Sequence, residues 1–231
     1  MRAAQPAVKF RCEGSFEREL RTRGFRFVAG VDEVGRGSLF GPVVAAAAIL
    51  SPDRPIRGLN DSKQLEPERR VVLAERIRER AVAWATAAVD AATIDYMNIY
   101  NASRLAMRIA VEKLAPPADF ILIDALPLEV RIPQRPVIKG DARCHAIAAA
   151  SILAKVHRDA WMDRWHEVYP EYGLTRHKGY FTPEHAQALE NYGPTPLHRL
   201  SFEPVRACSH FPADSDPWAE QLELFDSVGA S

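Results

Sequence analysis

The stretch Val28-Ala29-Gly30-Val31-Asp32-Glu33-Val34-Gly35-Arg36-Gly37-Ser38-Leu39-Phe40-Gly41-Pro42-Val43-Val44-Ala45 sets two adjacent acids and a glycine-flanked arginine between two runs of small and β-branched residues. Such runs are typical of neighbouring strands. Successive side chains of a strand point to opposite faces, so we expect Asp32 and Glu33 to share a site only where the strand bends, at Gly35. Gly35 and Gly37 have no side chains to shield their backbone N–H groups, so the turn could closely approach an oxygen-rich ligand. The two acids could bind a cation beside it. Taken alone, a Gly-Arg-Gly turn or an Asp-Glu pair is more often purely structural.

Length and composition predict one large α/β domain with tails, because the chain has 231 residues and 47% hydrophobic content. No apolar run approaches the roughly 20 residues that span a bilayer, and the N-terminus lacks an apolar signal segment. We therefore expect a cytoplasmic protein without membrane contact. Three widely spaced cysteines, Cys12, Cys144 and Cys208, indicate reduced thiols rather than disulfides or a zinc site.

The charge distribution permits nucleic-acid binding without demonstrating it. Lys and Arg number 30, as do Asp and Glu, so the formal net charge is zero. Residues 212–231 contain five acids and no Lys or Arg, which leaves the rest of the chain at +5. Such a weak basic field is compatible with a local basic strip on the surface.

The periodicity of apolar residues predicts alternating strands and helices. We expect helices over residues 16–23, 67–81 and 93–114 and from 146 towards His166, and strands over 25–32, 42–50, 84–89, 119–124 and 137–141. Ser62 or Asp61 is the expected cap of the helix at 67–81. The run 119–124 is almost wholly apolar, which is typical of a central strand buried on both faces.

Three of the predicted strands end in acidic residues. The first ends at Asp32 and Glu33, the second at Asp124 and the third at Asp141. Active sites in open α/β sheets lie where strands end and helices begin, so these acids can come together in one site. Converging carboxylates repel one another unless a cation lies between them, and oxygen ligands without Cys or His favour Mg²⁺ or Mn²⁺. Asp141 by itself is better explained as a helix cap. Together, the acids predict a two-metal site for phosphoryl transfer.

The chain resembles the ribonuclease HII family, the type 2 ribonucleases H, in its bacterial form. The family's opening motif is similar to Gly30-Val31-Asp32-Glu33-Val34-Gly35-Arg36-Gly37 followed by Gly41-Pro42. Further similar motifs, within a match over about residues 25–205, are Asn60-Asp61-Ser62-Lys63, the strand ending in Asp124, Lys139-Gly140-Asp141, residues 148–156 and His177-Lys178-Gly179-Tyr180.

The resemblance implies roles for two groups of residues. The family's four catalytic, metal-binding acids correspond to Asp32, Glu33, Asp124 and Asp141. The residues that sense the ribose 2′-hydroxyl and the RNA-to-DNA step correspond to Gly35, Arg36, Gly37 and Tyr180. Candidate phosphate contacts are Lys63, Lys139, Lys155 and Lys178, although each alone is more often a solvated surface charge.

The activity implied is that of an endonuclease using two Mg²⁺ or Mn²⁺ ions. It would hydrolyse the RNA strand of RNA/DNA hybrids and nick duplex DNA 5′ of embedded ribonucleotides, leaving 5′-phosphate and 3′-hydroxyl ends. Ribonucleotide excision and RNA primer removal are the corresponding cellular roles. Two alternatives stay open: another two-metal nuclease of this fold, such as a junction resolvase, and a hybrid-binding protein without catalysis.

The implied fold is ribonuclease H-like: a mixed β-sheet flanked by helices, with a mostly helical C-terminal extension over residues 163–205. We expect a lead-in at residues 1–24, the catalytic domain at 25–205 and an acidic flexible tail at 206–231, in a monomeric protein. Ser38 and Phe40 depart from the family's usual proline and small residue, and Ala125 from its usual glycine. The seven histidines show no metal-ligand spacing.

The tail carries a candidate docking segment, Gln221-Leu222-Glu223-Leu224-Phe225. It resembles the pentapeptide by which bacterial replication and repair proteins bind the sliding clamp. In that mode the glutamine makes polar contacts, and the leucine and phenylalanine, here Leu222, Leu224 and Phe225, fill an apolar pocket. A terminal helix folded back on the domain is the alternative.

Overall fold

The computed structural model describes residues 12–124 and 126–208. The departure at Ala125 and the predicted clamp-binding segment at Gln221–Phe225 lie outside the described residues.

A five-stranded mixed sheet forms the centre of the fold, as predicted. The strands are β1 (Val28–Val34), β2 (Val43–Ile49), β3 (Ala83–Val89), β4 (Phe120–Ile123) and β5 (Gln134–Pro136), in the order β3-β2-β1-β4-β5. β2 pairs antiparallel with β1 and β3, whereas β4 lies parallel to both β1 and β5. The two parallel neighbours β1 and β4 therefore bring their carboxyl ends to the same edge of the sheet.

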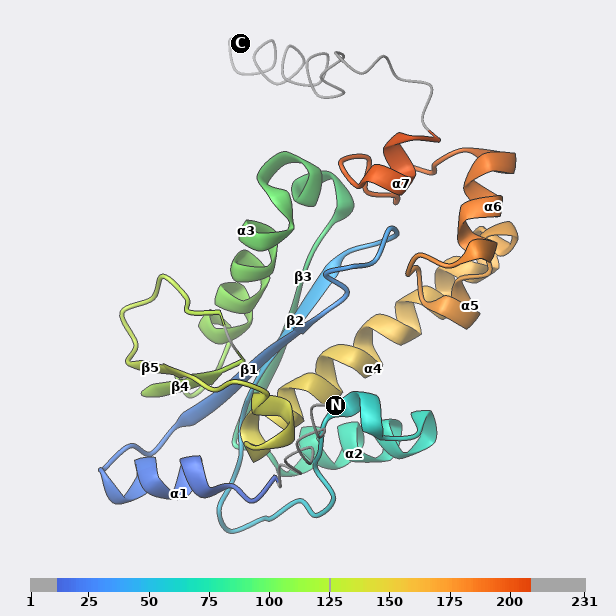
Figure 1. Ribbon diagram of the computed structural model, residues 1–231. Helices are drawn as coiled ribbons and strands as arrows, with labels where there is room; N and C mark the ends of the chain where they lie inside the picture. The colour runs from blue at the N-terminus through green and yellow to red at the C-terminus, as the bar shows by residue number, and fades with distance from the viewer. Residues whose placement is uncertain (1–11, 125, 209–231) are drawn as a thin grey trace, which may run out of the picture.

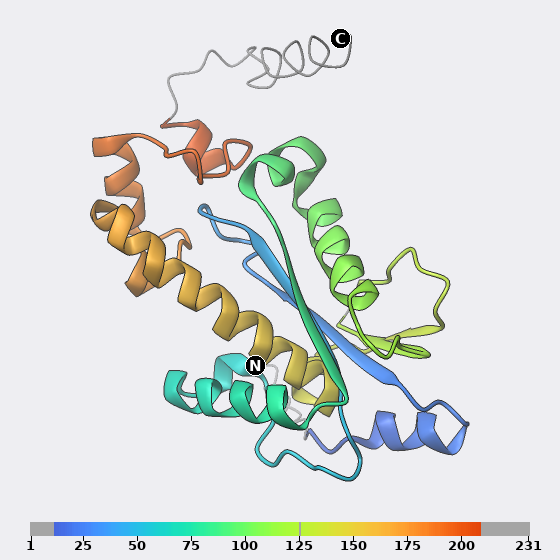
Figure 2. The ribbon, with the colours of Figure 1, turned by 180° about the vertical axis from the view of Figure 1, so that it is seen from behind.

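Helices cover both faces of this sheet (Figures 1 and 2). On one face packs α3 (Ala91–Glu112), and on the other pack α4 (His145–Val168) and α2 (Pro67–Arg80). The alternating side chains of β2 divide between two separate cores, one against α3 and one against α2 and α4. The short helix α1 (Ser15–Thr22) adjoins the beginning of β1. Within the described residues, no helix is long and apolar enough to cross a membrane.

The closest contact between the layers is that of β1 with α4. A Cβ atom added at Gly30 would lie 2.0 Å from the backbone carbonyl carbon of Ala146 and 2.2 Å from the backbone nitrogen of Ile147. Only glycine allows the strand and the first turn of α4 to approach this closely. This approach holds the acids of β1 at a fixed position relative to the segment that precedes α4.

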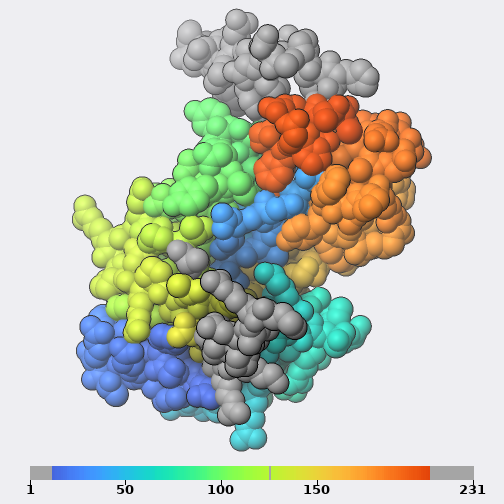
Figure 3. All heavy atoms as spheres, in the orientation of Figure 1, coloured from blue at the N-terminus to red at the C-terminus, as the bar shows by residue number. Residues whose placement is uncertain are grey.

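The residues after α4 form the mostly helical extension that the sequence predicts. They include α5 (Leu174–His177), α6 (Pro183–Tyr192) and α7 (Glu203–Arg206). Asp95 of α3 anchors this extension, because its carboxylate accepts hydrogen bonds from Leu200 N at 2.8 Å and Ser201 N at 2.9 Å. Figure 3 shows the blue surface that includes the β1–β2 turn between the green surface of α3 and the orange surface of the extension.

Two local predictions near the site are wrong. The strand expected at 137–141 is instead Gln134–Pro136, and Asp141 lies in the 3₁₀ turn Gly140–Ala142, ahead of α4 rather than at its start. Asp61 caps a separate 3₁₀ turn, Ser62–Gln64, by accepting from Lys63 N at 2.9 Å, whereas α2 begins without a side-chain cap. The three cysteines are free thiols, as expected.

A chain of buried histidines links the extension to Tyr180. Thr195 N donates to His198 Nδ1 at 2.9 Å, so the ring proton of His198 resides on Nε2 and faces His185 Nε2 at 3.1 Å. His185 Nδ1 then donates to the carbonyl oxygen of Tyr180 at 3.0 Å. Both rings are neutral in this arrangement. Burial, with a smaller contribution from the nearby His185, lowers the pKa of His198 to about 3.

The hydrogen-bonded histidines His198 and His185 should make the stability of the protein sensitive to acid. The pKa of His198 is about 3 in the folded protein and 6.5 in the unfolded chain. The contribution of neutral His198 to the free energy of unfolding is therefore complete above pH 6.5 and is lost as the pH falls towards 3. The free energy of unfolding lost on His198→Asn should therefore be smaller at pH 5 than at pH 7.5, by roughly 2 kcal/mol. Urea titrations of both proteins at the two pH values measure the difference. A loss that is the same at both pH values would contradict a neutral, buried His198.

Candidate active site

Asp32 and Glu33 lie in the part of β1 that extends beyond its pairing with the parallel strand β4. β1 pairs with β4 only as far as Val31 opposite Ile123, while its pairing with β2 continues through Val34. β1 stays regular past both acids up to Val34, and the chain turns at Gly35, whose φ is 89°, as predicted. Their side chains point to opposite faces of β1. Both can approach one site around the edge of β1 that is not paired with β4.

Asp124 and Asp141 reach the same edge from two other segments. Asp124 follows β4 directly, and its backbone N–H donates to the carbonyl oxygen of Val31 at 3.4 Å. Its carboxylate Oδ1 accepts a hydrogen bond from Gly140 N at 3.2 Å, which fixes it beside the turn that carries Asp141. The structure thus brings together the four acids that the sequence singles out.

Burial, together with neighbouring negative charges, raises the pKa of each of the four carboxylates. Asp32 is 8% exposed, and its pKa lies well above the usual value because of burial first and then the charges of Glu33, Asp124 and Asp141. Burial also raises the pKa values of Glu33 and Asp124. The pKa of Asp141 rises to about 6, through burial and the charges of Asp61 and Asp124. The site therefore concentrates negative charge in a partly buried position, which a bound cation would relieve.

The donor set fits a hard divalent cation. All four side chains offer oxygen, and Glu33 Oε2 is buried without a hydrogen-bond partner in the described part of the chain. Arg36 Nη1 holds the other oxygen of Glu33, Oε1, at 3.4 Å. As they stand, no three His, Cys, Asp or Glu side chains among residues 12–124 and 126–208 form a closed ligand set.

Two buried serines, Ser62 and Ser151, form a hydrogen-bonded group next to Asp32. Ser151 of α4 hydrogen-bonds to Asp32 and lowers its pKa, which partly offsets the burial. The hydroxyl of Ser151 also lies 2.9 Å from that of Ser62. Both serines occur in motifs that the sequence highlights, but periodicity alone gives no sign that they meet across the fold.

The glycine turn and Tyr180 lie side by side. Ser38 forms a β-bridge with Tyr180, and Leu39 N donates to the Gly179 carbonyl oxygen at 2.9 Å. A Cβ atom added at Gly37 would lie 3.9 Å from Tyr180 Cε1, so the ring flanks the turn. The ion pair between Arg36 and Glu33 connects this turn with the carboxylates.

Two buried arginines lie behind the turn. Arg158 of α4 donates to Ser38 Oγ at 2.6 Å and to the carbonyl oxygens of Phe40 and Lys178 at 3.0 and 2.9 Å. Arg199 donates to the carbonyl oxygens of Gly41 and Arg36 at 3.0 and 2.8 Å. Both guanidiniums are fully buried. An arginine on a helix normally indicates a solvated face, so sequence gives little warning of such a role.

The departures Ser38 and Phe40 are accommodated by Arg158. Ser38 Oγ accepts from this arginine and donates to the Phe40 carbonyl oxygen at 2.9 Å. The Phe40 ring packs edge-on against His198 and Trp165, with centroids 4.9 and 5.7 Å away. These residues therefore fix the turn to α4 and to the extension.

The candidate phosphate-binding lysines differ in their surroundings. The charge of Lys63 acts on both Asp124 and Asp141 and lowers their pKa values, so Lys63 adjoins the site. Lys155 forms a 2.7 Å ion pair with Asp159, and Lys178 pairs with Asp163. Lys139 has φ 52°, in the turn just before Asp141. Of the four, Lys63 has the clearest electrostatic link to the carboxylates.

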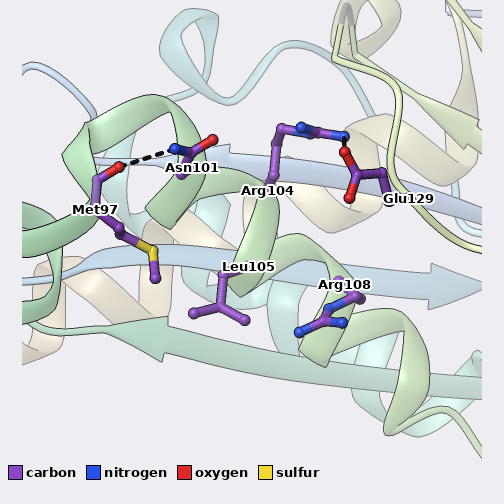
Figure 4. A pocket seen from close by; sticks show the side chains of 6 residues that line it. All are labelled: Met97, Asn101, Arg104, Leu105, Arg108 and Glu129. Atoms are coloured by element: carbon purple, nitrogen blue, oxygen red, sulfur yellow. Dashed lines mark hydrogen bonds and ion pairs between the residues drawn. The ribbon is translucent and has the colours of Figure 1, made fainter.

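A separate cavity of about 250 Å³ lies against α3 (Figure 4). Its lining residues are Met97, Asn101, Arg104, Leu105, Arg108 and Glu129. Arg104 is already paired with Glu129 at 3.0 Å, and the Asn101 side chain donates to the Met97 carbonyl oxygen. None of the predicted site residues lines this cavity, so it is distinct from the carboxylate cluster.

Comparison with known proteins gives a consistent result. The sequence profile described as Ribonuclease HII matches residues 29–205. A ribonuclease HII from Solibacter usitatus (strain Ellin6076) is 70% identical over 231 residues, covering 100% of both chains. The crystal structure of ribonuclease H2 from Pyrococcus horikoshii OT3 superposes with a TM-score of 0.69 at 26% identity, covering 79% of this chain and 97% of the other. In a PCNA:RNase HII complex from Archaeoglobus fulgidus, the matched chain has a TM-score of 0.65 at 25% identity, covering 81% of this chain and 98% of that one.

Proposed function

The chain belongs to the ribonuclease HII family and is an endonuclease acting on RNA/DNA hybrids, and we propose that Asp32, Glu33, Asp124 and Asp141 carry out this reaction with divalent cations. The observation behind the proposal is the convergence of four partly buried carboxylates, with raised pKa values, at the edge of β1 beyond β4.

The four acids would hold two Mg²⁺ or Mn²⁺ ions. Such ions, when bound, lower the pKa of an attacking water and stabilise the leaving 3′ oxygen. The chain itself supplies the positions: the hydrogen bond from Gly140 fixes the Asp124 carboxylate, and Ser151 supports Asp32. Lys63 adds a positive charge near Asp124 and Asp141, suited to a substrate phosphate.

The turn Gly35-Arg36-Gly37, with Tyr180 beside it, would distinguish RNA from DNA. The 2′-hydroxyl is the group that separates the two at a cleavage site. Arg36 and Gly37 are exposed, whereas the flanking Gly35 and Ser38 are buried, so the turn presents its tip to a ligand. The half-buried ring of Tyr180 offers a flat surface for the sugar beside that tip.

Labelled duplexes test the function as proposed. With Mg²⁺ or Mn²⁺, the protein should cut an RNA/DNA hybrid and nick duplex DNA 5′ of a single ribonucleotide, and it should leave all-DNA duplex intact. Cleavage of branched DNA without ribonucleotides would favour the resolvase alternative. Binding of the hybrid without any cut would favour a hybrid-binding protein that lacks catalysis.

Tyr180→Ala should slow cutting at an isolated ribonucleotide by about 10- to 100-fold, because an aromatic stacking surface contributes about 1–3 kcal/mol. Tyr180→Phe is the matched control, since it keeps the ring over the Arg158 guanidinium, which lies 5.6 Å from the ring centroid. Steady-state rates on one single-ribonucleotide duplex compare the three proteins. Equal rates for Tyr180→Ala and the wild type would make Tyr180 a packing residue only.

The acidic tail would tether the enzyme to a sliding clamp. Its segment Gln221-Leu222-Glu223-Leu224-Phe225 has the polar and apolar pattern of a short docking peptide. The Archaeoglobus fulgidus relative was solved in complex with PCNA, which supports a search for such a partner. We further propose that the enzyme works as a monomer in the cytoplasm, in ribonucleotide excision and RNA primer removal.

Removal of residues 212–231 should abolish clamp binding and leave the cleavage of short oligonucleotides unchanged, because none of the site residues lies in that segment. Phe225→Ala should have nearly the same effect through the loss of one apolar anchor. Surface plasmon resonance with purified bacterial clamp measures the binding. If full-length and truncated proteins bind equally, or neither binds, the tether hypothesis is wrong.

A further inference from the structure

The orientation of one peptide group in the glycine turn depends on a buried arginine. Ser38 N donates to the Gly35 carbonyl oxygen at 3.3 Å, so residues 35–38 form a four-residue turn whose middle peptide joins Arg36 and Gly37. Turns of types I and II differ by a flip of this middle peptide, and type II requires a positive φ at the third residue. Gly37 is free to adopt either form, but it does not have a positive φ here.

The Arg36 carbonyl is held from inside the protein. Arg199 Nη1 donates to it at 2.8 Å, and Arg199 is fully buried. The C=O and N–H groups of a trans peptide point in opposite directions. With the Arg36 carbonyl directed inward to Arg199, the Gly37 N–H points away from Arg199, and Gly37 itself is exposed.

Arg199 is costly to bury, which argues against a packing role alone. Within the described residues it forms no ion pair, and its Nη2 is buried without a hydrogen-bond partner. Burial, together with the charge of Arg158, lowers its pKa to about 9. An apolar side chain of similar size would fill the volume at lower cost. The two carbonyl contacts, to Arg36 and Gly41, are what an apolar residue could not supply.

Arg158 holds the neighbouring part of the same loop. Its side chain joins the Phe40 carbonyl to the Lys178 carbonyl and so links the loop to the segment that leads into Tyr180. A Cβ atom at Gly35 would lie 2.3 Å from Arg158 Nε, so this guanidinium also packs directly on the start of the turn. The two arginines therefore bind the loop from Arg36 to Pro42 through its carbonyl oxygens.

We propose that Arg199 is a positioning residue for ribonucleotide recognition: it holds the Arg36 carbonyl inward so that the Gly37 N–H faces the ribose. The inference rests on the proposed role of the glycine turn in sensing the 2′-hydroxyl. It assigns the donor for that contact to the Gly37 amide, and its orientation to a residue about 160 positions later in the chain.

The test combines Arg199→Met with a control variant that is destabilised in a part of the core away from the turn. Arg199→Met should reduce kcat/KM on a single-ribonucleotide duplex by at least about tenfold, the value of one hydrogen bond of about 1.4 kcal/mol. Leu73→Ala removes a fully buried side chain from the core under α2, away from the turn, and should change kcat/KM less than twofold at a temperature where both variants are folded. Arg199→Lys, which keeps a donor, should recover part of the activity and serves if Arg199→Met does not fold.

A second measurement follows the Gly37 amide itself by NMR. In the wild type its signal should shift on addition of a single-ribonucleotide duplex and shift much less with the all-DNA duplex. In Arg199→Met this difference should disappear. A wild-type signal that responds equally to both duplexes would count against the glycine turn as the 2′-hydroxyl sensor. A ribonucleotide-specific shift that persists in Arg199→Met, or an equal activity loss in Leu73→Ala, would overturn the role of Arg199 alone.

Discussion

Asp124→Asn should lower kcat by more than about 100-fold while leaving the fold intact. Groups that only orient metal ligands already contribute 10- to 100-fold to activity, so the loss of a ligand should exceed that. The fold should tolerate the change, because an asparagine oxygen can still accept the hydrogen bond from Gly140. Burial and like charges raise the pKa of Asp124, so a neutral side chain should leave the thermal stability without divalent cations unchanged or slightly higher.

The matched control for this variant is Glu129→Gln, which removes one carboxylate from an exposed ion pair with Arg104. Initial rates on the single-ribonucleotide duplex and melting curves in EDTA should show wild-type behaviour for the control. Activity of Asp124→Asn within tenfold of the wild type would refute the assignment of Asp124 as a metal ligand.

Gly30→Ala should be the most damaging small substitution for stability. The new methyl group would meet backbone atoms of Ala146 and Ile147 within 2.2 Å, and backbone cannot rotate out of the way. Strand β1 and helix α4 would have to separate, at a cost of about 3 kcal/mol or more. For a chain of this size, that corresponds to a fall in melting temperature of roughly 6–12 °C.

Gly37→Ala is the control for this prediction. Its new methyl group would meet only Tyr180 Cε1, at an ordinary contact distance of 3.9 Å, and Gly37 does not have a positive φ. Its melting temperature should stay within a few degrees of the wild type, since such substitutions change stability by about 1 kcal/mol or less. Similar melting temperatures for Gly30→Ala and Gly37→Ala would show that the contact between β1 and α4 is looser than the structure indicates.

The elements with strong periodicity were predictable from the sequence. β2 is buried along its whole length, and β4 is a short apolar run that ends next to an acid, so the apolar pattern reveals both. β5 could not be found this way, because Gln134–Pro136 is polar and partly exposed and is defined only by its pairing with β4. The prediction for residues 137–141 took the β-branched pair Val137-Ile138 as the strand instead.

The acids of the site were also predictable, but not the way in which they meet. Asp32 and Glu33 share the site because β4 ends before β1 does, and pairing lengths are not visible in the sequence of β1. Arg158 and Arg199 were not predictable at all. Their importance comes from contacts with backbone carbonyls distant in sequence, and carbonyl groups carry no sequence signal.

Crystals grown with Mn²⁺ and measured at the manganese absorption edge locate the bound ions by anomalous scattering, without reference to activity. We expect anomalous peaks in contact with carboxylate oxygens of Asp32, Glu33, Asp124 and Asp141 in the wild type, and weaker or absent peaks in Asp124→Asn. Manganese peaks held by other residues, or peaks unchanged in the variant, would contradict a metal-dependent site built from these four acids.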